Sequence, residues 1–93
     1  MSEKTAPALA KLDELLPLLR ALPAGPNTSD LIETAEALRR AVAAFHMEAI
    51  RFRMYSVDRE LARLGHAECG RVFGEVRQAL EAAGFHTRSH TAP

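Results

Sequence analysis

The sequence predicts an all-α protein of a single domain, and three observations lead to that fold class. A chain of 93 residues allows one domain. Apolar residues make up 47% and charged residues 26%, as in ordinary globular proteins. The apolar set is rich in helix formers, with 17 Ala and 12 Leu against four Val and two Ile. We therefore expect three main helices within the domain 1–93, with residues 1–5 and 86–93 flexible.

A first helix is predicted to begin after Thr5. Thr5 is a suitable N-cap, and Pro7 falls in the first turn, where a missing backbone N–H costs nothing. Leucines then follow at helical spacing: Leu9, Leu12, Leu15, Leu16, Leu19 and Leu22. An interior proline removes a hydrogen bond and clashes with the preceding turn. Pro17 therefore predicts a kink or a break into two short helices, and residues 23–29 predict a loop.

The second helix is predicted to be one long element over about residues 30–64. Asp30 and Glu33 fit an acidic capping box, and neither Pro nor Gly occurs before Gly65. At about 1.5 Å per residue this helix would be roughly 50 Å long. The alternative is a new helix starting near Ser56, which would close a compact monomeric bundle.

A third helix is predicted from about Ala67 to Ala83. Gly65 supplies the left-handed cap that ends the preceding helix, and Gly84 ends this one. The apolar residues repeat at helical spacing: Val72, Phe73, Val76, Ala79, Leu80 and Ala83.

Two apolar stripes run along the predicted long helix. The first contains Leu31, Ala35, Leu38, Val42, Phe45, Ala49 and Phe52. The second contains Met47, Ile50, Met54, Val57, Leu61 and Leu64. The second stripe is rotated by about a quarter turn or more, so the first and third helices could each cover one half in an open layer. Apolar surface left exposed marks an association site. We therefore predict an elongated bundle completed by homodimerisation, with an interface of Phe45, Ile50, Phe52 and Met54.

Four side chains of the second helix are candidates for a ligand site: His46, Arg53, Tyr55 and Glu60. Positions 46, 53 and 60 lie at seven-residue intervals, which places them on one side of a continuous helix. A metal site on one helix face needs a second ligand three or four residues away. Those positions around His46 hold Val42, Ala43, Ala49 and Ile50. We therefore predict no metal and no cofactor, and we interpret His46 as a packing residue.

Residues after the long helix offer little chemistry. Cys69 is the only cysteine, so the chain can form no intramolecular disulfide, and we interpret it as a small packed residue. Gly70 and Gly74 have the spacing that lets two helices approach closely. His86 and His90 stand four apart in a polar tail, where metal binding in vitro carries no functional meaning.

Charge disfavours nucleic acid as a partner. Twelve basic residues balance twelve acidic ones, and no region is basic enough to follow a phosphate backbone. No signal peptide and no apolar run of about 20 residues is present, so we expect no membrane partner and a cytoplasmic location. Ten Arg against two Lys is typical of a GC-rich bacterial genome.

Enzyme motifs such as a glycine-rich phosphate loop or a nucleophile elbow are absent from the sequence. We therefore predict a non-enzymatic interaction or assembly module that pairs with itself as a homodimer or docks on another protein. The alternative is a small helical-bundle enzyme or ligand-binding protein with a site around His46 and Arg53. A histidine phosphotransfer domain is a weaker alternative, because Met47 stands where an acidic residue usually follows the histidine.

Overall fold

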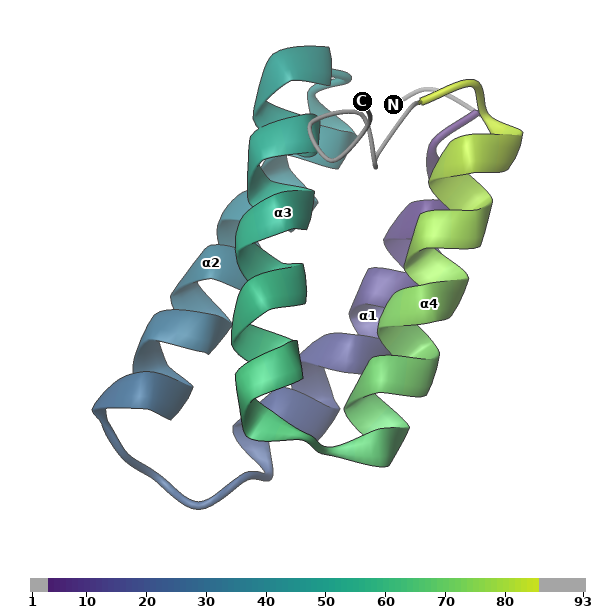
Figure 1. Ribbon diagram of the computed structural model, residues 1–93. Coiled ribbons are helices and arrows are strands. Elements are labelled where there is room, and N and C mark those ends of the chain that lie inside the picture. The colour runs from purple at the N-terminus through teal and green to yellow at the C-terminus, as the bar shows by residue number, and fades with distance from the viewer. Residues whose placement is uncertain (1–3, 86–93) are drawn as a thin grey trace, which may run out of the picture.

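A computed structural model describes residues 4–85 of the chain, and that part holds four helices (Figure 1). They are α1 (Ala6–Arg20), α2 (Pro26–Ala43), α3 (Met47–Leu64) and α4 (Ala67–Ala82). Helix accounts for 82% of the described residues and no strand is present among them. The all-α prediction is confirmed, with four helices in place of three.

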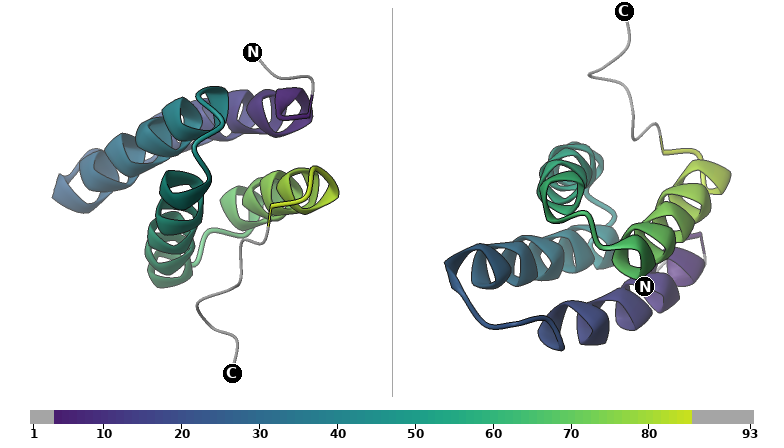
Figure 2. Two further views of the ribbon diagram at one scale, coloured as in Figure 1. Left: turned by 90° about the horizontal axis from the view of Figure 1, so that it is seen from above. Right: turned by 60° about the horizontal axis from the view of Figure 1, so that its bottom comes forward.

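The helices alternate in direction along the chain, so sequence neighbours are antiparallel (Figure 1). α1 packs against α4 and α2 packs against α3, while α1 and α2 join these two pairs. Of the helix pairs that are consecutive in sequence, α3 and α4 contact each other least, and Figure 2 shows them diverging from the turn that links them. The molecule measures 34 × 32 × 19 Å. The predicted elongated layer, built on a helix of roughly 50 Å, is therefore wrong.

The predicted long helix over residues 30–64 is wrong because the chain reverses at Phe45 and His46. Phe45 has a φ of 58°, in the left-handed region that normally favours glycine. The Phe45 N–H donates to the Val42 carbonyl at 3.1 Å, and the His46 N–H donates to the Ala41 carbonyl at 3.0 Å. This pair of bonds is a Schellman motif, which satisfies the carbonyls at the end of α2.

A contact with the end of α4 holds Phe45 in that conformation. α4 ends in the same motif, with Gly84 at a φ of 98° and the Phe85 N–H donating to the Leu80 carbonyl at 3.0 Å. Phe85 is buried, and its ring meets that of Phe45 edge to face with centroids 5.3 Å apart. The left-handed conformation costs about 1–2 kcal/mol for a residue other than glycine. An edge-to-face aromatic pair contributes about 0.5–1.5 kcal/mol beyond its buried area, which offsets much of that cost.

Other helix boundaries follow the sequence signals more closely. α1 runs through Pro17, so the predicted break into two helices is wrong. α2 begins at Pro26 and not near Asp30, because proline is well suited to the first helical position. The left-handed Gly65 at the end of α3 and the span of α4 are confirmed, the latter to within one residue.

The core is a single cluster to which all four helices contribute. α3 contributes one narrow stripe: Ile50, Met54, Val57 and Leu61. Ile50 is 1% exposed and Met54 is fully buried, so these two predicted interface residues lie inside one chain. Cys69 is buried as well, and that burial raises the pKa of its thiol. A Cβ on Gly70 or Gly74 would meet nothing within 4 Å, so the close helix approach expected there is not found.

Several expectations concern the ends of the chain. Residues 1–3 and 86–93, for which we predicted flexibility, lie outside the described residues. The pair His86 and His90 lies there too. Thr5, which we expected to be flexible, is fully buried at the N-cap position of α1. None of the helices between residues 4 and 85 has the length and apolar character needed to cross a membrane.

Candidate functional site

Large exposed apolar side chains gather on α3 and at the turn before it. In the described chain these residues are Phe45, Met47, Phe52, Tyr55 and Leu64. Phe52 is the most exposed of them, at 58%. None belongs to the core cluster, which is complete without them. α3 therefore carries apolar groups both on the stripe that enters the core and elsewhere on its surface.

A second seam runs along the side of α3 that faces away from the core. It consists of five exposed residues: Glu48, Phe52, Tyr55, Arg59 and Ala62. Their spacing alternates between four and three, which is the pattern of a helix-packing seam. At about 100° per residue these positions lie roughly opposite the buried stripe through Ile50 and Met54. We call these five residues the outer face of α3.

Arginines hold the two aromatic rings in place. The Arg53 guanidinium carbon lies 5.2 Å from the centroid of Phe52, and that of Arg59 lies 5.6 Å from the centroid of Tyr55. Such contacts contribute about 0.5–1 kcal/mol at exposed sites. The rings are thereby restrained at the surface, which lowers the entropy cost of packing them against another molecule.

Several charged groups elsewhere in the bundle are paired with one another. Lys11 of α1 lies 3.0 Å from Glu75 of α4, and the Arg39 guanidinium donates to Asp13 at 2.7 Å across α1 and α2. The hydrogen bond to Glu75 raises the pKa of Lys11, and that from Arg39 lowers the pKa of Asp13.

Several charges on α3 lack such partners. In residues 4–85, Glu48, Arg51, Arg59 and Arg63 form no ion pair. The outer face and its edges therefore carry charges that remain available to another molecule.

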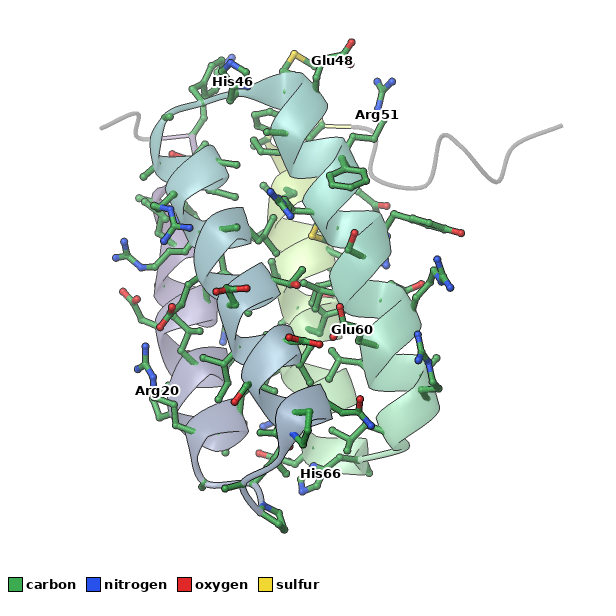
Figure 3. The ribbon with its side chains drawn as sticks, turned by 90° about the vertical axis from the view of Figure 1, so that its left-hand side faces the viewer. Arg20, His46, Glu48, Arg51, Glu60 and His66 are labelled. Atoms are coloured by element: carbon green, nitrogen blue, oxygen red, sulfur yellow. The ribbon has the colours of Figure 1, made fainter. Side chains whose placement is uncertain are left out.

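The four predicted ligand residues do not converge. His46 stands at the N-cap position of α3 without a side-chain cap hydrogen bond and is exposed, so it does not pack in the core of the chain. Glu60 lies 14 positions further on, about 20 Å along the helix, and Figure 3 shows the two at different levels of the bundle. Tyr55 is on the outer face, whereas Arg53 covers the Phe52 ring.

Glu60 instead faces α2, where the antiparallel pairing of α2 and α3 forms a cavity of about 410 Å³. Glu60 accepts a hydrogen bond of 3.4 Å from the Thr34 hydroxyl. The cavity is lined by Asn27, Thr28, Asp30, Leu31, Glu60, Arg63 and Leu64. Sequence reasoning missed Asp30 and Arg63 as neighbours, because in one continuous helix these two residues would lie at opposite ends.

No protein-family model, curated protein or solved structure matches this chain. Within residues 4–85, no group of three His, Cys, Asp or Glu side chains is placed to hold a metal ion. The geometry of the helices is therefore the basis on which a function can be inferred.

Proposed function

We propose that this chain is an assembly module, a small helical domain that joins protein chains through the outer face of α3 and carries out no catalysis itself. The observation that carries the proposal is the pair of exposed aromatic rings, Phe52 and Tyr55, on the side of α3 opposite the core. A contiguous exposed apolar patch on a soluble domain marks an interaction site. A cytoplasmic location belongs to the same proposal.

The composition of the outer face supports association with protein. Interface centres are enriched in Tyr, Phe and Arg, and truncation of such residues typically accounts for most of the binding energy. Here Phe52 and Tyr55 are followed along the seam by Arg59, which lies over the Tyr55 ring, and Arg53 lies over the Phe52 ring. Neither ring is needed to complete the core, so both are available for a contact between chains.

Two arginine variants test this proposal. Phe52→Arg places a charge on the outer face, and Ala10→Arg places the same charge on an exposed position of α1. We expect Phe52→Arg to lose the protein contacts that the wild-type chain makes through this face, measured by light scattering of the pure chain and by capture on immobilised protein. Ala10→Arg should keep those contacts. Retention of all wild-type contacts by Phe52→Arg would overturn the proposal.

The cavity beside Glu60 favours a second candidate, a ligand-binding function. Two carboxylates, of Asp30 and Glu60, and the guanidinium of Arg63 line one cavity, which suits a small polar molecule that carries both signs of charge. Screening amino-acid-like compounds by their effect on the melting temperature tests it. A compound that stabilises wild type and not Arg63→Ala would support ligand binding, and a screen without such a compound would count against it.

A further inference from the structure

The outer face of α3 is complementary to itself, and we infer that two copies of this chain pair through it, antiparallel, with a two-fold axis next to Tyr55. This inference rests on the proposed function and names the partner. A two-fold contact uses the same patch on both chains, so residue i meets residue j and j meets i. The patch must then be symmetric about its own centre in both spacing and chemistry.

The spacing meets that condition. Glu48 and Ala62 stand seven positions on either side of Tyr55, and Phe52 and Arg59 stand three and four positions away. An antiparallel second copy therefore brings Tyr55 against Tyr55 at the axis. It also brings Phe52 against Arg59 of the second copy, and this contact occurs twice.

The chemistry of the Phe52 contact is favourable. The Arg59 guanidinium already lies over an aromatic ring, that of Tyr55 in its own chain. Between two packed helices it would lie between Tyr55 and the Phe52 ring of the second copy. A cation over a ring face contributes more where water is excluded, up to about 2 kcal/mol.

Charges at the edges of the face match in the same register. Arg51 and Asp58 flank the seam beside Phe52 and Arg59, on the same edge of the helix. In antiparallel pairs, residues of the same edge meet across the seam, so Arg51 of one copy meets Asp58 of the other, twice. Asp58 also lies 3.3 Å from Arg77, but its side chain is 59% exposed and can accept a second donor. Glu48, at the end of α3 shown in Figure 3, similarly meets Arg63 of the second copy.

A parallel pair would be unfavourable. It places each seam residue against itself, so Arg59 would face Arg59 and Glu48 would face Glu48. Like charges directly across an interface oppose binding and select against that partner orientation. The charge pattern therefore selects the antiparallel arrangement.

The contact is short, which sets its strength. α3 has 18 residues, or about 27 Å of helix, and only two seam positions on each chain are aromatic. Interfaces at the small end of the range are weak and transient. We expect a dimer that dissociates in the micromolar range.

Site-specific cross-linking tests orientation and register. In the full chain with Cys69→Ala, a single cysteine is introduced as Ser56→Cys, Ala62→Cys or, as a control on α1, Ala10→Cys. The reagent is a thiol cross-linker no longer than the roughly 8–10 Å between packed helix axes. Ser56 adjoins the axis, so Ser56→Cys should link to a covalent dimer. Two Ala62→Cys chains would lie about 21 Å apart along the seam and should stay monomeric, as should Ala10→Cys. A mixture of Glu48→Cys and Ala62→Cys chains should link to each other.

Two results would overturn the inference. Linking of Ala62→Cys as efficient as that of Ser56→Cys would indicate a parallel pair. A lack of linking at Ser56, together with a monomeric mass at several hundred micromolar, would exclude the second copy as partner. The proposed function would survive that result if Phe52→Arg still abolished capture of another protein, so the two failures are distinguishable.

Discussion

The ring of Phe45, in the turn after α2, packs edge to face on the ring of Phe85, in the turn after α4, at a centroid distance of 5.3 Å. Both turns are Schellman motifs, and the two residues stand at adjacent positions of that motif, Phe45 in the left-handed place and Phe85 one place later. The contact therefore ties together the ends of two helices that are far apart in sequence, and it fixes the point where α2 gives way to α3.

Substitutions at Phe45 should reverse the usual order of alanine and glycine. Within a helix, Gly is less stable than Ala by up to about 1 kcal/mol, whereas a left-handed residue costs about 1–2 kcal/mol unless it is glycine. With a φ of 58° at this position, we expect Phe45→Gly to be more stable than Phe45→Ala by about 1 kcal/mol in urea unfolding. The opposite order would indicate that α2 and α3 are one continuous helix.

The break at residues 44–46 shows where sequence reasoning reached its limit. Gly65 and Gly84 indicate the turns in which they lie, because left-handed helix caps favour glycine. The predicted bounds of α4 followed from these two residues. Phe45 carries no such signal, since its turn depends on a contact with Phe85, 40 positions away. Local propensity also allowed a break at Pro17, but α1 continues through it as one helix.

The candidate site was predicted in part for the same reason. Phe52 was singled out as a member of an apolar helical stripe and Tyr55 as a candidate ligand residue, and both are exposed on α3. Ile50 and Met54 belong to the same sequence stretch but face the core. Separating the two sets requires knowing which helices cover α3, and that follows from the turn at Phe45.

Acid should weaken the link between α1 and α2. The hydrogen bond from Arg39 lowers the pKa of Asp13 below its ordinary value in the folded state. A lowered carboxyl pKa gives stability that is present above the unfolded value and is lost as the pH falls through the folded value. Because the pair is exposed, its worth is below about 1 kcal/mol. In thermal unfolding we expect the difference between wild type and Asp13→Asn to shrink from pH 6 to pH 3; a constant difference would show that the pair is not formed.

Truncation to alanine should reduce the free energy of unfolding far more at the core position Ile50 of α3 than at the surface position Phe52. Ile50 is 1% exposed and Phe52 is 58% exposed. Replacing a buried Ile by Ala costs about 2–5 kcal/mol, whereas surface substitutions usually stay within about 0.5 kcal/mol. Urea unfolding at low protein concentration, where the chain is monomeric, should show a large loss for Ile50→Ala and almost none for Phe52→Ala. Equal losses would mean that Phe52 is covered within one chain.

Reversing the charge of Arg51 or of Asp58 alone should weaken the dimer, and reversing both together should restore it. In the antiparallel pair Arg51 of one copy meets Asp58 of the other, and each contact occurs twice. Arg51→Asp alone would face Asp58 with a like charge, and Asp58→Arg alone would face Arg51 in the same way. Exposed ion pairs contribute about 0.2–1 kcal/mol each, so loss and repulsion over two contacts should raise the dissociation constant roughly tenfold. The double variant rebuilds both pairs with reversed polarity. Its dissociation constant, measured by sedimentation equilibrium, should return to within about threefold of wild type.

Because Asp58 also lies near Arg77, the melting temperature of each variant at low concentration separates local destabilisation from lost association. A double variant that associates no better than either single one would show that these two side chains do not meet.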